Sequence, residues 1–174
     1  MIVKIVRDDD PPHPRKDWDN LGTMLYCSSR YTLGDEQVDA EVIQQVLKTR
    51  VYQGEGEVIV LPVYAYIHGG IALNTTGFSC VWDSGMCGCI LVSKAKVRSE
   101  WKVKRISQKL YGQVINGLKG EVQTYAQYLE GDVWGYIIQD DNGEQVDACY
   151  GFFGQETAQQ EADMMLKHLQ TQAA

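Results

Sequence analysis

Apolar side chains recur at helical spacing in three stretches of the chain. In residues 105–130 they return every three or four positions, a pattern that predicts one long amphipathic helix. Gly117 and Gly120 fall inside this stretch, and because glycine weakens a helix they predict a break or a kink. Shorter helices are expected over residues 39–50, with an aspartate as the N-cap, and at about residues 156–170.

Strand-like runs lie between and around these helices. The chain begins with "MIVKIV", which alternates enough to be a first strand at a sheet edge. The run "VIVLPVYAYI" is rich in β-branched and aromatic residues, and Pro62 within it predicts an edge or a bulge. The next run, "MCGCILVS", ends at Ser93, which predicts the N-cap of a short helix. Two later runs flank Asp140-Asp141-Asn142-Gly143, and Asn-Gly in that position predicts a β-hairpin.

The connections between these elements indicate the fold class. Most strands are joined by turns rather than by helical crossovers, which predicts an α+β fold with a mainly antiparallel sheet and helices packed on one face. Three prolines in residues 11–14 exclude a helix and a strand ladder, so residues 8–20 are expected to form a proline-rich surface loop. No stretch resembles a linker, and we expect a single domain over residues 1–174.

Composition and charge narrow the class of protein. Apolar residues make up 44% of the chain and charged residues 22%, and no apolar run approaches the roughly 18 residues of a membrane span. The N-terminal apolar stretch is too short for a signal peptide, so we expect a cytoplasmic protein whose five cysteines are thiols. A net charge of −7 argues against direct nucleic-acid binding. The acidic clusters indicate either a solvated surface or an anion-mimicking surface that binds a basic patch of another protein.

The densest cluster of reactive side chains is "GFSCVWDSGMCGC", residues 77–89. It holds three of the five cysteines, but the spacing C-x6-C-x-C differs from the C-x2-4-C pairs of structural zinc sites. Cys87 and Cys89 fall in a strand-like run and are expected in the core, as is Cys149. The sequence also contains no phosphate-binding glycine motif, and we expect neither a metal nor a cofactor.

A catalytic role for this cluster rests on three residues. A cysteine hydrolase needs a thiolate, a histidine base and a group that orients the histidine, and Cys80, His68 and Asp83 supply those types. Their spacing is not specific to a known catalytic family. Cys80 and Asp83 are expected to face solvent, and the stretch as a whole is interpreted as a structured turn that leads into a buried strand.

Three long blocks carry a resemblance that covers roughly residues 14–154. The blocks are "PRKDWDNLGTMLYCSSRYTLGD", "LPVYAYIHGGIALNTTGFSCVWDSGMCGCILVSKAKVR" and "GEVQTYAQYLEGDVWGYIIQDDNGEQVDACYGFFG". They resemble a family of uncharacterised proteins of phages and prophages with DNLGT, RYxLGD and FSCxWDSG motifs. This chain departs from the family pattern at Val81, where the family has proline, and at Ser28 and Ser29, where the family has a histidine before Arg-Tyr. If that histidine is catalytic in the family, this chain lacks it.

The resemblance implies a small accessory protein that works in the cytoplasm of a bacterial host. We therefore predict a non-catalytic protein that binds a host protein with a basic surface and inhibits a defence system such as a CRISPR or restriction nuclease. The alternative function is the cysteine hydrolase. The sequence is also compatible with a homodimer. The residues expected to bind the partner are Asp8, Asp9, Trp18, Asp19, Asn20, Arg30, Asp35, Glu36, Trp82 and Asp83.

The same loops lead to a structural prediction. The loop around Trp18 and the loop of residues 78–85 are both long, polar and aromatic, and loops of that kind are often functional. We expect the two to pack together, with Arg30 bridging to Asp19 or Asp83.

Overall fold

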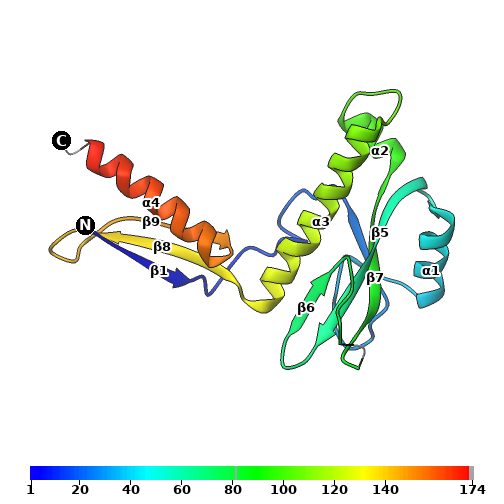
Figure 1. Cartoon of the computed structure of the whole chain (residues 1–174), viewed down its shortest axis with the longest axis horizontal. Helices are drawn as coiled ribbons and strands as arrows, with labels where there is room; N and C mark the ends of the chain where they lie inside the picture. The colour runs from blue at the N-terminus through cyan, green and yellow to red at the C-terminus, as the bar shows by residue number, and fades with distance from the viewer. Residues whose placement is uncertain (81, 173–174) are drawn as a thin grey trace. The chain divides into compact units, whose positions relative to one another are not determined.

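The computed structural model describes residues 1–80 and 82–172, and its contacts group into two compact units. Unit 1 combines residues 1–14 with the chain from residue 127 onward, and unit 2 consists of residues 15–126. Figure 1 shows the elements of both units, and each unit is described by itself.

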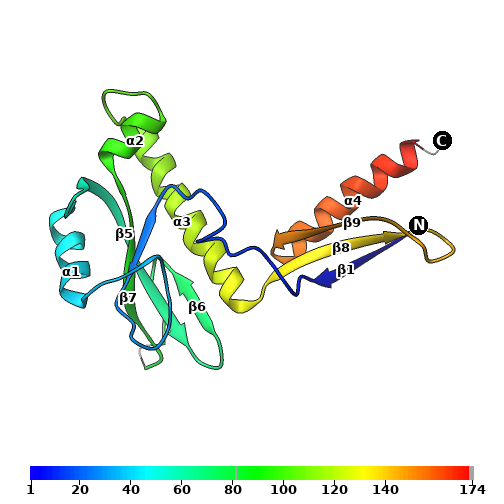
Figure 2. The ribbon, with the colours of Figure 1, turned by 180° about the vertical axis from the view of Figure 1, so that it is seen from behind.

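Unit 1 is an antiparallel sheet with a helix on one face. In the described part of the chain its strands are β1 (Ile2–Arg7), β8 (Val133–Gln139) and β9 (Gln145–Phe153), in the order β1-β8-β9. Helix α4 (Gln155–Gln172) lies along this sheet (Figures 1 and 2). Its Ala158 and Ala162 are fully buried, and Ala162 packs in a cluster with Tyr136 and Ile138 of β8. Small side chains at these positions allow the helix to approach the strands closely.

The predicted hairpin is confirmed between β8 and β9. Oδ1 of Asp140 accepts the N–H groups of Asn142 and Glu144, at 2.8 and 2.9 Å. Gly143 has a φ of +85°, a conformation in which glycine is favoured because a Cβ atom is strained there. The turn is therefore fixed by the residue types that predicted it.

Unit 2 is built on a larger sheet. Its strands are β2 (Thr23–Tyr26), β3 (Glu36–Gln37), β4 (Val51–Tyr52), β5 (Gly56–Ile67), β6 (Ile71–Asn74) and β7 (Ser84–Ser93). The order is β3-β2-β7-β5-β4, and β6 also pairs with β5. The β2–β3 pair is parallel and the others are antiparallel. The helices are α1 (Ala40–Thr49), α2 (Lys94–Glu100) and α3 (Gln108–Glu130), of which α3 continues into unit 1.

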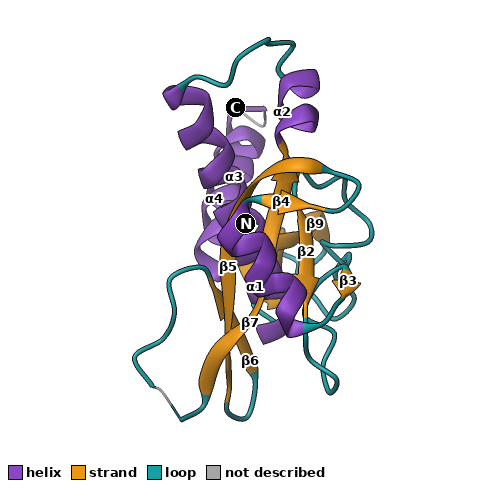
Figure 3. Ribbon diagram, turned by 90° about the vertical axis from the view of Figure 1, so that its right-hand side faces the viewer, coloured by secondary structure: helices purple, strands orange, loops and turns teal. Residues whose placement is uncertain are grey.

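Helices α1 and α3 cover opposite faces of this sheet. On one face, α1 buries Ile43 and Val46 against the strands. The strand residues of that cluster are Leu25, Val58, Val60, Cys89 and Leu91. Ile90 lies between two of them in β7 and points to the other face, where Leu118 of α3 and Ile90 both lie close to Gly22. Figure 3 and the other ribbon views show the strands between the two helices.

The predicted α+β class with mainly antiparallel pairing is confirmed. The sheet of unit 1 has its helix on one face, as expected, whereas the larger sheet is covered on both faces. Helix α3 runs through Gly117 and Gly120 without a break, because the stripe of Leu110, Val114 and Leu118 is buried and holds it against the sheet.

Two local predictions concern capping and strand edges. Ser93 caps α2 as predicted, with its hydroxyl accepting the N–H of Lys96 at 3.2 Å, whereas Asp39 precedes α1 without a side-chain cap. The pairing of β5 with β7 shifts register next to Pro62, between Val63 and Tyr64, which is the predicted bulge.

No helix in the described residues is long and apolar enough to cross a bilayer.

Candidate functional site

The β5–β6 hairpin and the start of β7 bring His68 and Asp83 together. Ile67 lies opposite Ile71 of β6, and its N–H donates to the carbonyl of Asp83 at 3.1 Å. His68 follows in the turn, where Gly69 has a φ of +72°. As a result, Nδ1 of His68 lies 3.5 Å from Oδ2 of Asp83.

The β6–β7 loop, residues 75–83, is fixed at both ends. Val81, which belongs to this loop, lies outside the described residues. Oδ1 of Asn74 accepts the N–H groups of Thr76 and Gly77, at 3.1 and 2.7 Å. At the other end, the hydroxyl of Ser84 donates to the carbonyl of Cys80. These hydrogen bonds tie Thr76, Gly77 and Ser84 to their neighbours at the two ends of the loop.

Aromatic side chains gather around this loop. The ring of Tyr66 stacks on His68 with 6.2 Å between centroids and lies 5.7 Å from the ring of Phe78. Trp82 is 97% exposed, a larger fraction than any other large apolar side chain of the described residues. The loop thus carries an exposed indole at Trp82, and the next residue, Asp83, pairs with His68 of the aromatic cluster.

The chemistry open to His68 and Asp83 depends on their surroundings. Their side chains are 72% and 42% exposed, so water surrounds much of the pair and weakens its electrostatic interactions. Cys80 is partly buried. The structure therefore brings together His68 and Asp83, two of the three residues of the alternative hydrolase. The pair is open to solvent and is not enclosed in a pocket.

The other predicted partner-binding residues are distributed over both units. Asp8 and Asp9 lie in unit 1, directly after β1, where Oδ1 of Asp8 accepts the N–H of Asp10 at 3.1 Å. Asn20 is partly buried in unit 2. The exposed residues of the set in unit 2 are Trp18, Asp19, Arg30, Asp35, Glu36, Trp82 and Asp83, although only 21% of the Asp35 side chain is exposed.

Asp35 has a different setting, because it is paired with a buried arginine. Nε and Nη2 of Arg15 both donate to the Asp35 carboxylate, the first at 3.0 Å. Nη1 of Arg15 donates to Glu121 of α3 at 2.7 Å, and Nη2 also donates to the carbonyl of Gly22 at 2.7 Å. The Arg15 side chain is only 3% exposed. This network of Arg15, Asp35 and Glu121 is the main buried polar feature that sequence reasoning missed.

Backbone groups complete the network. Oε1 of Glu121 accepts the N–H of Leu21 at 2.8 Å, and Oδ2 of Asp35 accepts the N–H of Met24 at 2.7 Å. Burial alone would lower the pKa of Arg15, but the hydrogen bonds and charges of the two carboxylates outweigh it and raise the pKa above its usual value. The DNLGT and LGD motifs therefore converge on one buried ion-pair network that holds the segments together.

The predicted packing of two loops is wrong. Nζ of Lys96 donates to the carbonyls of Asn20 and Leu21, both at 3.0 Å, so the loop around Trp18 lies by α2, beyond the C-terminal end of β7. The loop of residues 78–85 leads into the opposite, N-terminal end of that ten-residue strand. Among the described residues Arg30 forms no ion pair with Asp19 or Asp83, and its guanidinium lies 5.8 Å from the ring of its neighbour Tyr31.

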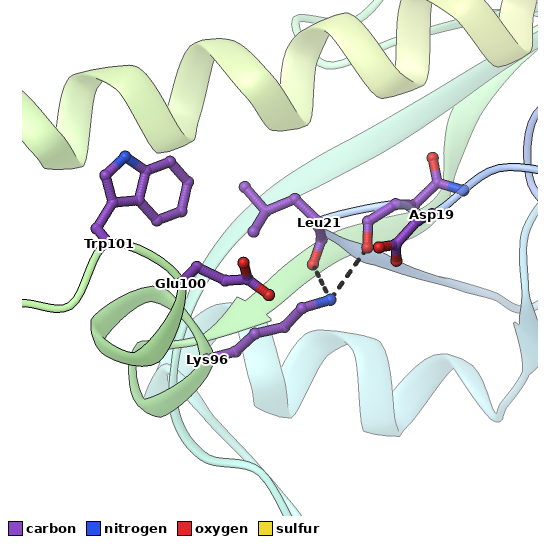
Figure 4. Close-up of a pocket in the computed structure, with 6 residues that line it drawn as sticks. Asp19, Leu21, Lys96, Glu100 and Trp101 are labelled. Carbon is purple, nitrogen blue, oxygen red and sulfur yellow. Dashed lines mark hydrogen bonds between the residues drawn. The ribbon is translucent and has the colours of Figure 1, made fainter.

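A shallow hollow of about 230 Å³ lies where the loop meets α2. Figure 4 shows Lys96 reaching the backbone there, with Asp19, Glu100 and Trp101 around it. Both of these hydrogen bonds of the lysine go to main-chain oxygens of this chain. We interpret the hollow as a structural junction between the loop and α2.

The cysteines have separate environments. Cys89 is completely buried in the cluster under α1, as predicted, and Cys87 is partly buried. Burial raises the pKa of both thiols to about 12. Cys149, predicted in the core, is exposed because β9 is an edge strand. No group of three or more His, Cys, Asp or Glu side chains in the described residues is arranged to hold a metal ion.

Comparison of the chain with models of protein families finds no match, and neither do comparisons with curated proteins and with solved structures.

Proposed function

We propose that this protein acts by non-catalytic binding to another protein, with Trp82 as the anchor. The observation that carries the proposal is the 97% exposure of Trp82 on a loop fixed at both ends. Exposing an indole to water costs free energy that burial in a partner recovers, and tryptophan is enriched among the residues that dominate binding energy. Asp83, the next residue, and its partner His68 would add polar contacts to the partner protein.

The proposed target is a host protein with a basic surface in the bacterial cytoplasm, such as a CRISPR or restriction nuclease. Three features support this target. The blocks of the chain resemble a family of phage and prophage proteins, the net charge is −7, and Asp83 lies next to the anchor. A negative protein is steered toward a basic groove by long-range attraction, and this attraction weakens as salt increases.

The experiment is a capture of proteins from a bacterial lysate that has been treated with nuclease, so that nucleic acid cannot bridge. The dissociation constant of the captured protein is then measured with purified wild type and with Trp82→Ala. We expect Trp82→Ala to weaken binding by about 2 kcal/mol or more, mainly through faster dissociation. Trp101→Ala is the matched control, because Trp101 is 41% exposed and is not part of the loop.

Two outcomes would contradict the proposal. One is a captured protein whose affinity is the same for wild type and Trp82→Ala. The other is the absence of any captured protein from hosts of phages that encode related blocks.

The hydrolase remains a second candidate because Nδ1 of His68 lies 3.5 Å from Asp83. Its test is turnover of a generic ester or peptide substrate by wild type, Cys80→Ser and His68→Ala. Turnover that both variants abolish, with the folded state intact by circular dichroism, would replace the binding proposal with catalysis.

A further inference from the structure

The segment from Lys94 to Lys109 carries a charge opposite to that of the rest of the chain. These 16 residues include seven of the chain's 16 lysines and arginines but only one of its 23 acidic residues, Glu100. The segment consists of α2, the connection to α3 and the first residues of α3. Although the net charge of the chain is −7, this part of unit 2 is strongly basic.

Four of these cations line one hollow. The hollow has a volume of about 380 Å³, and its lining consists of Lys94, Arg98, Lys104, Arg105, Ile106 and Tyr111. Arg98 belongs to α2, and Tyr111 belongs to the first turn of α3. Lys104 and Arg105 lie in the segment that connects α2 to α3. The chain thus folds back between α2 and α3 so that charges up to 11 residues apart in sequence face one space.

Three of the four cations are available to a ligand. Lys94 donates to Glu57 at 2.6 Å, and this contact, with a smaller contribution from the charge of Arg98, lowers the pKa of the Glu57 carboxyl. Arg98, Lys104 and Arg105 are exposed, and none of them forms an ion pair with another described residue. Like charges that line one hollow repel one another, and an anionic ligand relieves that repulsion.

Two further features of the hollow suit a nucleotide. A second hollow of about 210 Å³ adjoins the first through Ile106 and Tyr111 and lies at the N-terminus of α3, a 23-residue helix whose dipole attracts negative charge. The ring of Tyr111 is 42% exposed and lines both hollows. An exposed aromatic ring among unpaired cations is the arrangement that binds single strands, with phosphates on the cations and a base on the ring.

We propose that this hollow is a binding site for single-stranded nucleic acid, with backbone phosphates on Arg98, Lys104 and Arg105 and a base stacked on Tyr111. The net charge does not oppose this, because at physiological salt a phosphate interacts with charges within a Debye length of about 8 Å and is screened from the rest. The site is independent of the proposed function, since no residue of the hollow belongs to the β6–β7 loop.

The test is fluorescence anisotropy with single-stranded DNA and single-stranded RNA of about ten nucleotides, and with duplex DNA of the same length, across a salt series. With three cations on phosphates, the logarithm of the binding constant is expected to fall by about 2 for each tenfold increase in salt. Lys104→Gln/Arg105→Gln should reduce that slope to below about 1. Tyr111→Ala should weaken binding by roughly five- to a hundredfold without changing the slope.

The matched control is Lys48→Gln/Lys167→Gln, which removes the same charge at two exposed lysines outside the hollow and should bind like wild type. Equal weakening by the control would overturn the site, as would the absence of binding at low salt. Binding to duplex as tight as to single strands, with no effect of Tyr111→Ala, would overturn the single-strand assignment. Competition by polyglutamate as strong as by the oligonucleotides would show a site for acidic protein instead. The DNA and RNA arms decide which nucleic acid is preferred.

Discussion

Arg15 is a single side chain that connects segments far apart in the sequence. Its guanidinium binds carboxylates of Asp35 and Glu121, whose side chains are 21% and 16% exposed. Arg15→Ala would leave both carboxylates mostly buried without their cation. We expect the free energy of unfolding to fall by about 3–5 kcal/mol, measured by urea denaturation.

Arg30→Ala is the control for that measurement. Arg30 is exposed and was the arginine predicted to bridge two carboxylates, but it has no such contact in the described structure. Its removal should change the free energy of unfolding by no more than about 0.5 kcal/mol. A larger loss for Arg30→Ala than for Arg15→Ala would contradict the network.

The thiols of Cys87 and Cys89 should resist alkylation in the folded protein. With a pKa of about 12, only a trace of either is thiolate at pH 8, so their labelling should be about a thousandfold slower than that of a thiol with the ordinary pKa. Exposed Cys149 should be labelled first, as read by mass spectrometry of the peptides. Labelling of Cys87 as fast as Cys149 would contradict the assigned burial.

The same pKa shifts give a pH dependence. The folded state keeps these protons more tightly than the unfolded chain, whose cysteines lose them near pH 9. The unfolded chain therefore binds fewer protons above pH 9, and the stabilisation present below that pH is lost as the pH rises toward 12. Urea denaturation should show a lower free energy of unfolding at pH 10.5 than at pH 8, because unfolded thiols with an ordinary pKa of about 8.5 lose their protons between these two values.

At the scale of elements, β2 and β7 approach closely where β7 has a glycine. Gly88 lies opposite Tyr26, and a Cβ atom on it would come within 2.1 Å of the carbonyl oxygen of Leu25. Because that atom belongs to the backbone, Gly88→Ala must displace a strand. We expect a loss of about 1–3 kcal/mol in the free energy of unfolding.

Gly85→Ala tests whether this loss comes from the close approach. Gly85 lies in the same strand, and a Cβ atom there meets no atom within 4 Å. We expect its free energy of unfolding to stay within about 0.5 kcal/mol of wild type. Similar losses for the two variants would point to a general cost of replacing glycine in β7 and would exclude the proposed clash.

Elements that depend on a few neighbouring residues were predictable. The hairpin at Asp140–Gly143 and the cap at Ser93 are encoded within four or five positions, and both are confirmed. The last helix was expected at residues 156–170 and spans Gln155–Gln172. The prediction of a break at Gly117 is wrong. Burial of one face of α3 stabilises the helix, and this gain exceeds the loss that the two glycines cause.

Contacts between distant segments could not be predicted from the sequence. Arg15 meets a partner 106 residues away, and no local pattern distinguishes it from the exposed Arg30. In the same way, β1 pairs with β8, so that Ile2 lies opposite Gln139. That pairing places residues 1–14 in unit 1. The two long loops were paired by composition alone, and composition carries no information on which end of β7 each one occupies.

At the scale of the whole molecule, charge is segregated. The basic segment from Lys94 to Lys109 leaves the remaining chain more acidic than the net charge of −7 indicates. Long-range attraction to a basic partner depends on this acidic majority, whereas short-range binding of phosphate depends on the local cations. The proposed functions of the two regions can therefore be separated by their response to substitution and salt.

The last prediction uses this separation on the captured partner. Asp9→Lys/Asp19→Lys reverses two exposed acidic side chains, and Asp35 is left unchanged because its replacement would break the Arg15 network. The association rate constant should fall by roughly two- to tenfold at low salt, and its salt dependence should flatten, while the dissociation rate stays near that of wild type. Trp82→Ala should show the reverse pattern in surface plasmon resonance, with faster dissociation and little change in association. An unchanged association rate for Asp9→Lys/Asp19→Lys at low salt would mean that the partner is not steered by the acidic surface, and its binding face would then not be basic.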